Sequence, residues 1–254
     1  MSLATLTLAS AMAMAAGLVG CFAVMRRMAL AGDALSHVAL PGIGVALALH
    51  VHPLLGAIAM LGFGGLIVWA FEERSRLATE TLIGVVFSAA LAIGSMTTSG
   101  EDLIEALFGG DTRPSSPVET TFVLLAALAV TAFIVAKKRA LVVALISPDI
   151  ARTVGINVRR LNLLYLQMFA LTIALGLRYL GVLLMGSLII IPAATAKQFS
   201  RNLSQMLVIA AAMAVAVTIV GSIAAAWAHR ATGPFIVTLA AACFFLTFVR
   251  HHRP

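Results

Sequence analysis

Residues 203–228, with the sequence LSQMLVIAAAMAVAVTIVGSIAAAWA, contain no charged side chain. A helix needs about 20 consecutive apolar residues to cross the roughly 30 Å hydrocarbon core of a bilayer, so this stretch is predicted to span a membrane. Further apolar runs lie at residues 3–25, 34–49, 53–71, 82–98, 118–136, 160–178, 179–196 and 234–249. The runs at 34–49 and 234–249 are short. The sequence therefore predicts an all-α, polytopic membrane protein with eight or nine transmembrane helices.

The composition of the whole chain supports this class. Of its 254 residues 61% are hydrophobic and 11% are charged, and the mean hydropathy is +1.07. Soluble domains are usually about 45–50% apolar and about 25% charged. The chain has too little charge to cover a soluble globular surface, which argues against a soluble enzyme, a disordered regulator or a secreted disulfide scaffold. No repeat or low-complexity linker divides it, so residues 1–254 are predicted to form a single transmembrane domain.

The net charge of +7 comes from basic residues in short loops between the apolar runs, where they indicate membrane orientation instead of nucleic-acid binding. With nine spans and the N-terminus outside, 14 of the 17 basic residues lie on the cytoplasmic side. These are Arg26, Arg27, Arg74, Arg76, Lys137, Lys138, Arg139, Arg152, Arg159, Arg160, Lys197, Arg201, Arg250 and Arg253. The loop around residues 99–119 carries five of the ten acids and is placed outside.

Ionisable residues enter the membrane most clearly in the stretch Gly32-Asp33-Ala-Leu-Ser-His37-Val-Ala-Leu-Pro41-Gly42-Ile-Gly44. Asp33 and His37 are spaced i, i+4, so on a helix they share one face, where they can bind a divalent cation such as zinc or manganese. Counted from the Arg26–Arg27 pair, His37 lies about 15 Å along the helix, near the bilayer midplane. We expect Pro41, Gly42 and Gly44 to break the helix there, as in many transporters. The alternative is that Asp33 and His37 only hydrogen-bond one another.

The longest cytoplasmic segment contains Ser147-Pro148-Asp149-Ile150-Ala151-Arg152-Thr-Val-Gly155. A Ser at the N-cap, a Pro at the first helical position and a Gly at the end are start and stop signals of a short helix. Two readings remain open for this helix. It either docks into a groove of a cytosolic partner or lies flat on the membrane surface.

The sequence also lacks the motifs of ATP binding and of zinc proteolysis. None of its three lysines follows a glycine, so a GxxxxGK[ST] phosphate-binding loop is impossible. His-Glu-x-x-His does not occur. If ATP drives transport, another polypeptide binds it.

Three segments resemble the metal-ion ABC permease family, and within it the membrane subunits of bacterial high-affinity zinc importers. They are Arg26–Gly42 with its Gly-Asp-x-x-x-His motif, Ile146–Ala151, and Gly181–Lys197 with Ile-Pro-Ala-Ala-Thr-Ala. The resemblance implies a non-enzymatic permease subunit in the bacterial cytoplasmic (inner) membrane, with Asp33 and His37 at the translocated metal. Residues Ser147, Pro148, Asp149, Ile150, Ala151 and Gly155 would couple it to the ATPase.

The same resemblance implies the partners. They are a second copy of the chain, two cytosolic ATP-binding subunits that carry the ATP, and a periplasmic or lipid-anchored metal-binding protein. No cofactor is expected to stay bound, since Zn²⁺, or Mn²⁺ or Fe²⁺, is the cargo. Two alternatives remain, namely a manganese or iron permease of the same family and an intramembrane metalloenzyme.

Overall fold

The structure is a computed structural model that describes residues 3–72, 74–75, 77–97, 116–180 and 182–251. Within these ranges all regular secondary structure is helical, and no strand is present. The helices are α1 (Leu3–Met25), α2 (Ala31–Ala48), α3 (Pro53–Glu72), α4 (Thr79–Thr97), α6 (Pro117–Ile146), α7 (Pro148–Thr153), α8 (Val158–Leu180), α9 (Val182–Phe199), α10 (Leu203–Trp227) and α11 (Thr232–His251). The predicted outer loop lies mostly outside the described residues.

Each apolar run corresponds to one long helix, so the all-α prediction is confirmed. Among the described residues six of these helices are long and apolar enough to cross a membrane, and three further helices contain shorter apolar segments, Thr79–Gly94, Leu184–Phe199 and Thr232–Thr247. The total of eight or nine spans therefore stays a prediction. The largest difference in length is in α6, which continues ten residues beyond the predicted end at residue 136. Lys137, Lys138 and Arg139 end the apolar run there, but lysine and arginine are good helix formers and do not end the helix.

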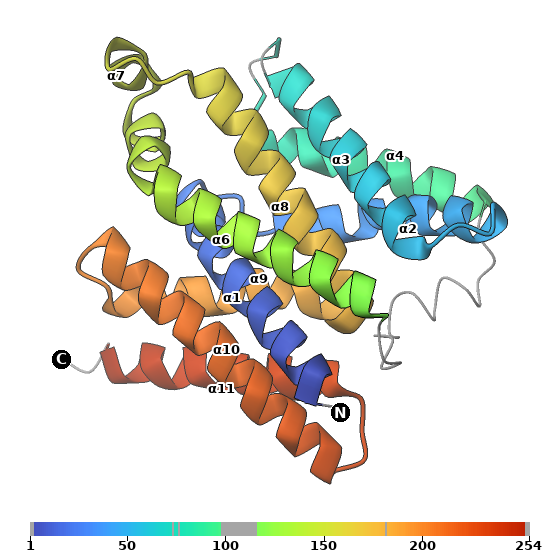
Figure 1. Ribbon diagram of the computed structural model, residues 1–254. Coiled ribbons are helices and arrows are strands. Elements are labelled where there is room, and N and C mark those ends of the chain that lie inside the picture. Colours follow the sequence, from blue (N-terminus) through green and yellow to red (C-terminus); the bar gives the residue numbers. More distant parts are fainter. Residues whose placement is uncertain (1–2, 73, 76, 98–115, 181, 252–254) are drawn as a thin grey trace.

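The interior of the protein is centred on α1, α8 and α9 (Figure 1). α1 packs against α6, α8, α9 and α10, and most of its residues are buried. α1 and α10 meet where Gly17 faces Ala210, and a Cβ at Gly17 would lie only 2.8 Å from the Ala210 carbonyl oxygen. Small residues at such crossings allow helix backbones to approach closely, as is typical of membrane helix pairs.

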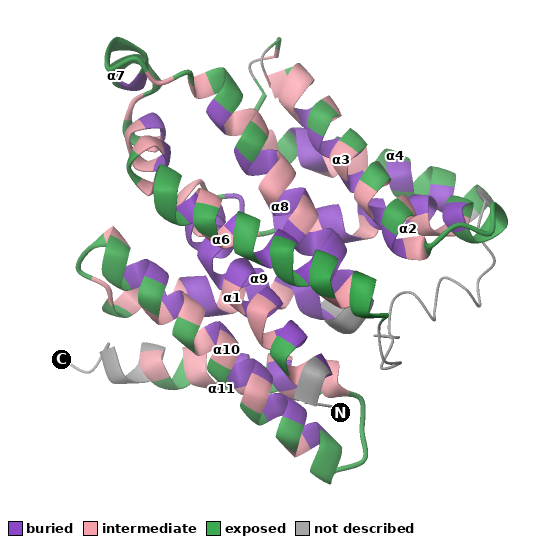
Figure 2. Ribbon diagram, in the orientation of Figure 1, coloured by how far each residue is buried: buried purple, intermediate pink, exposed green. Residues whose placement is uncertain are grey.

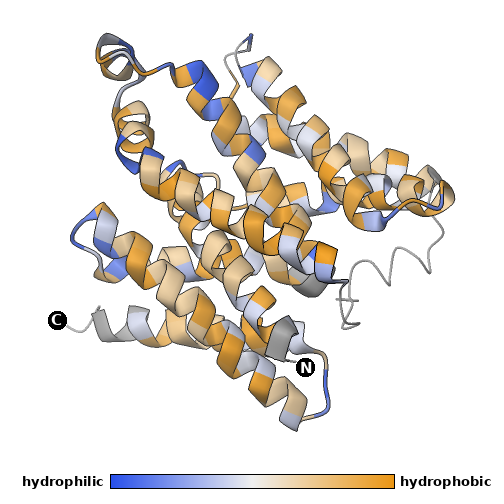
Figure 3. Cartoon of the chain, viewed as in Figure 1, coloured by the Kyte–Doolittle hydropathy of each residue, from blue (hydrophilic) through white to orange (hydrophobic). Residues whose placement is uncertain are grey.

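The outward faces of the peripheral helices are exposed and apolar (Figures 2 and 3). On α6, Leu125 and Leu128 are 60% and 62% exposed, and on α10, Val208 and Ile223 are 68% and 60% exposed. Polar residues gather instead at the helix ends, as in the segment between α9 and α10 (Figure 3). Large apolar exposed surfaces of this kind are unusual in soluble monomers and fit a chain surrounded by lipid.

Candidate functional site

α2 carries both candidate metal ligands. It begins at Ala31, so Asp33 lies in its first turn and His37 one turn further along the same face. The Asp33 side chain is exposed, whereas that of His37 is half-buried. In the described structure neither side chain forms a hydrogen bond or an ion pair, with the other or with any other residue. The hydrogen bond that the structural alternative requires is therefore not formed.

Two other helices bring a residue against this pair. Gly186 of α9 lies so close to Asp33 that a Cβ at position 186 would be 2.9 Å from the Asp33 Cα and 3.0 Å from its Oδ1. Phe87 of α4 faces His37, with ring centroids 5.6 Å apart and ring planes tilted by 53°. The pair is thus bordered by a bare backbone on the carboxylate side and by an aromatic ring on the imidazole side.

The predicted helix break at Pro41, Gly42 and Gly44 is wrong. α2 runs without interruption from Ala31 to Ala48 and includes all three residues. The reason is packing against neighbouring helices. A Cβ at Gly42 would lie 2.4 Å from the Gly56 carbonyl oxygen of α3, and a Cβ at Gly94 of α4 would lie 3.1 Å from the Pro41 ring. Pro41 and Gly42 lie at helix crossings. The helix continues through Pro41 although proline has no N–H and one backbone hydrogen bond is therefore missing.

The helical distance on which the predicted depth of the pair rests also changes. Residues 26–30 form a turn, in which Arg27 has a φ of 59°, before α2 begins. Helical rise therefore applies only from Ala31 to His37, which amounts to about 9 Å instead of about 15 Å. The carboxylate and the imidazole lie nearer to this turn than the sequence indicated.

The structure adds no third protein ligand to the pair. Within the described ranges no group of three or more His, Cys, Asp or Glu side chains is placed to hold a metal ion. His50 and His52 are exposed between α2 and α3. Nδ1 of His52 accepts a hydrogen bond from the Leu54 N–H (3.3 Å), so in the neutral ring the proton is on Nε2. That arrangement leaves no ring nitrogen of His52 with a lone pair for a metal.

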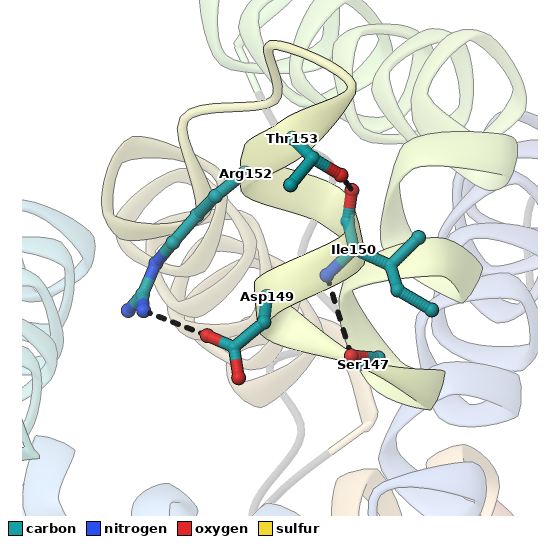
Figure 4. A network of polar contacts seen from close by, with 5 residues as sticks. All are labelled: Ser147, Asp149, Ile150, Arg152 and Thr153. Carbon is teal, nitrogen blue, oxygen red and sulfur yellow. Dashed lines mark hydrogen bonds and ion pairs between the residues drawn. The ribbon is translucent and has the colours of Figure 1, made fainter.

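α7 has the geometry that its sequence predicts (Figure 4). The Ser147 Oγ accepts a hydrogen bond from the Ile150 N–H (3.3 Å), and Pro148 occupies the first turn. Asp149 and Arg152 form an exposed ion pair at 3.1 Å. Gly155 follows the helix with a φ of 80°, in the left-handed region that favours glycine.

The two sides of α7 differ. Ala151 is fully buried and faces the rest of the chain, whereas Ile150 is 56% exposed, and Val154, just beyond the helix, is 68% exposed. Of the predicted coupling residues, Ile150 can therefore contact a partner directly, while Ala151 packs α7 against the rest of the same chain. α7 projects from one end of the molecule, between α6 and α8 (Figure 1).

The profile of the ABC 3 transport family matches residues 1–251. The chain belongs to this family. It is 31% identical over 241 residues to the high-affinity zinc uptake system membrane protein ZnuB of Haemophilus influenzae, covering 92% of each chain. It is 30% identical over 237 residues to the manganese transport system membrane protein MntC of Listeria innocua (92% of this chain, 84% of the relative). It is also 30% identical over 239 residues to the chelated iron transport system membrane protein YfeD of Yersinia pestis (92% and 80%).

A solved structure, PsaBC from Streptococcus pneumoniae in complex with Fab, has the same fold. It matches with a TM-score of 0.82 and 26% identity over 96% of this chain and 89% of the other. This ABC 3 family member is thus the membrane permease subunit of a metal-ion ABC transporter. Such subunits are not themselves enzymes, so the metalloenzyme alternative is wrong.

Sequence reasoning missed two residues of the ABC 3 permease that border the pair. Gly186 lies in the stretch Gly181–Lys197 that carries the family resemblance, but nothing in the stretch shows which helix it approaches. Phe87 is one of 13 phenylalanines, and its contact with His37 depends on how α4 crosses α2. A glycine within an apolar span was the only available signal, and it marks a close contact without naming the partner.

Proposed function

We propose that this chain is the membrane subunit of an ATP-driven importer that moves zinc into the cytoplasm through a site containing Asp33 and His37. The supporting observation is the pair itself, on one face of α2 and without a hydrogen-bond partner among the described residues. A carboxylate oxygen and an imidazole nitrogen are ligands of zinc, whereas an all-oxygen set suits manganese better. The zinc uptake protein of Haemophilus influenzae is one of the relatives.

The chemistry of the two residues fits a transient site. A cation that enters the membrane loses hydration, and the negative charge of Asp33 offsets part of that loss. His37 coordinates only as neutral imidazole. Two protein ligands hold zinc less tightly than the four of a structural site, and transport requires binding that is weak enough for release.

The proposed assembly contains two copies of this chain, two cytosolic ATP-binding subunits and an external metal-binding protein, in the bacterial inner membrane. The sequence has no phosphate-binding loop of its own, so ATP must be bound by a partner. α7 offers that partner a short capped helix with exposed Ile150 beside the exposed Val154. Helices of this kind are suited to bind in grooves of other proteins.

Uptake of radioactive zinc into proteoliposomes that contain the purified complex tests this proposal. We expect Asp33→Ala and His37→Ala each to reduce uptake to background, because one removes the charge and the other a ligand. Asp33→Asn, which keeps the shape, isolates the charge. Glu80→Ala is the matched control for the carboxylate, because Glu80 also lies in the first turn of a helix, α4. His50→Ala is the matched control for the imidazole, since His50 is exposed.

The metal is tested with the same vesicles. Wild type should take up zinc in preference to manganese, and His37→Asp, which makes the pair all-oxygen, should shift preference towards manganese. Stronger uptake of manganese or iron than of zinc by wild type would favour the manganese or iron alternative. Wild-type zinc uptake by the Asp33→Ala, His37→Ala double variant would show that the metal passes elsewhere.

A further inference from the structure

The connection between α7 and α8 is short, covering only residues 154–157, and backbone and side-chain hydrogen bonds hold it in place. The Ile156 N–H donates to the Ala151 carbonyl (2.9 Å). The Gly155 N–H donates to the Arg152 carbonyl (3.0 Å). Together with the positive φ of Gly155 these two bonds form a Schellman motif, which closes the end of a helix. Asn157 then caps the first turn of α8 with its side chain. A force applied to α7 is therefore passed to the start of α8.

The first turns of α8 hold the end of α1 through a half-buried arginine. The Arg26 Nη2 donates to the Asn162 Oδ1 at 2.8 Å, and its guanidinium lies 4.6 Å from the centroid of the Tyr165 ring. The buried Tyr165 hydroxyl in turn donates to the Val19 carbonyl of α1 (3.2 Å). Among the described residues no carboxylate pairs with Arg26, so the amide and the ring are what hold it.

The same turns of α8 also hold the end of α3 through an arginine and an aromatic ring. Here α8 supplies the arginine and the other helix supplies the ring. The Arg159 guanidinium of α8 lies 4.7 Å from the centroid of the Trp69 ring on α3. The Trp69 Nε1–H donates to the Arg159 carbonyl (3.1 Å). Both guanidinium–ring distances fall within the roughly 6 Å over which a cation is attracted to an aromatic face.

The two helices held in this way flank the helix that carries the candidate metal ligands. Arg26 begins the turn that leads into α2 and Asp33, and α3 crosses α2 at the Gly42–Gly56 contact. If the start of α8 moves, Arg26 and Trp69 should make α1 and α3 move with it. These are the helices before and after α2 in the sequence, so the movement reaches α2 from both ends. In Figure 1, α8 runs from α7 into the middle of the helices.

We propose that Arg26 and Trp69 are positioning residues that couple α7, through the first turns of α8, to the Asp33–His37 pair on α2. This inference rests on the proposed function, because it requires that metal movement is driven from α7. Neither residue needs to touch the metal or the ATPase. Their contribution is to make α1 and α3 follow α8 when α7 is displaced, so that ATP hydrolysis and metal release stay linked.

The test is the number of metal ions taken up per ATP hydrolysed by the full complex in proteoliposomes. Arg26→Gln removes the guanidinium, and Arg26→Lys keeps the charge but loses the planar group that contacts both Asn162 and Tyr165. Trp69→Phe keeps a ring but removes the N–H donor. Thr247→Val is the matched control, because it removes a side-chain hydrogen bond between α11 and α9 (3.4 Å) far from α7 in the sequence.

We expect Arg26→Gln and Trp69→Phe to hydrolyse ATP while the ratio of metal to ATP falls at least about fivefold. The ratio should fall less in Arg26→Lys, and Thr247→Val should keep the wild-type ratio. A role in packing alone would lower the thermal unfolding midpoint, the uptake and the ATPase rate together, with an unchanged ratio, and would overturn the inference. If Arg26→Gln does not fold, Arg26→Lys and Trp69→Phe decide. A wild-type complex that transports no metal would overturn the proposed function as well, whereas wild-type transport with unchanged variant ratios overturns only the coupling role.

Discussion

α2 and α7 are shaped by different kinds of contact. α7 owes its bounds to its own neighbours in sequence, namely the Ser147 cap before it and Gly155 after it. α2 owes its position to residues that are distant in sequence. Gly56 of α3 faces Gly42, and Gly186 of α9 faces Asp33. The conformation of α7 is thus determined locally, whereas the position of α2 is determined by its contacts with other helices.

In the function proposed above, this difference separates the part of the permease that contacts the ATPase from the part that binds the metal. If α7 is displaced by the proposed partner, it should keep its helical form, because its caps move with it. The Asp33–His37 pair has no such independence. Its surroundings, Gly186 of α9 and Phe87 of α4, change whenever α9 or α4 shifts relative to α2, which is useful in a transporter that must bind and then release a cation. Substitutions in the two regions should therefore fail in different ways.

The largest effect is expected where α2 crosses α3. Gly42→Val places a branched side chain where even a Cβ would lie 2.4 Å from the Gly56 carbonyl oxygen, so the helices must separate. Overpacking of this kind typically costs about 1–3 kcal/mol, and here a backbone group cannot move aside as a side chain would. We expect a lower thermal unfolding midpoint in detergent and the loss of metal uptake.

Gly84→Ala is the control for this prediction, because a Cβ at Gly84 of α4 meets nothing within 4 Å. Replacing a helical glycine by alanine without a clash should leave stability equal or raise it by up to about 1 kcal/mol. Equal unfolding midpoints for Gly42→Val and Gly84→Ala would contradict the view that non-local glycine contacts define the position of α2.

The same contrast explains what the sequence could predict. Continuous apolar runs and their lengths located every long helix, and cap residues located α7, because these signals lie within the segment itself. Pro41 and Gly42 were misread as a break, since the residues that face them, Gly94 and Gly56, belong to other helices. The helical distance from Arg26–Arg27 to His37 is shorter than the sequence predicts, because the sequence does not show that residues 26–30 form a turn. Which helix approaches Asp33 is a property of tertiary packing alone.

A smaller effect on stability, but a large one on function, is expected on the outer side of α7. Ile150→Glu puts a charge on a side chain that is 56% exposed, so the permease itself should fold with an unchanged unfolding midpoint. Docking into an apolar groove would then require burial of that charge, which costs several kcal/mol unless it is paired. We expect loss of the co-purifying ATP-binding subunit in detergent and of ATP-driven uptake.

Ala151→Arg provides the comparison on the inner side of the same helix. Ala151 is fully buried, so the arginine should displace α7 and lower stability as well as coupling. Normal partner co-purification by Ile150→Glu would show that α7 lies on the membrane surface or contacts its partner by another face.

The smallest effect is expected at Gly155, and it tests whether α7 is held by local rules. Its φ of 80° lies in the left-handed region, where a side chain other than that of asparagine or aspartate costs about 1–2 kcal/mol. A Cβ at this position meets nothing within 4 Å, so any penalty comes from the backbone and not from a clash. Gly155→Ala should therefore loosen the junction between α7 and α8 and reduce uptake a fewfold without changing the amount of folded permease. Gly155→Asn should lie closer to wild type, because asparagine adopts this conformation at helix ends. We expect metal uptake per ATP to be highest in wild type, lower in Gly155→Asn and lowest in Gly155→Ala. The same uptake for all three chains would mean that the stiffness of this junction plays no part in coupling, and the reverse order of the two variants would mean that contacts outside the connection determine its conformation.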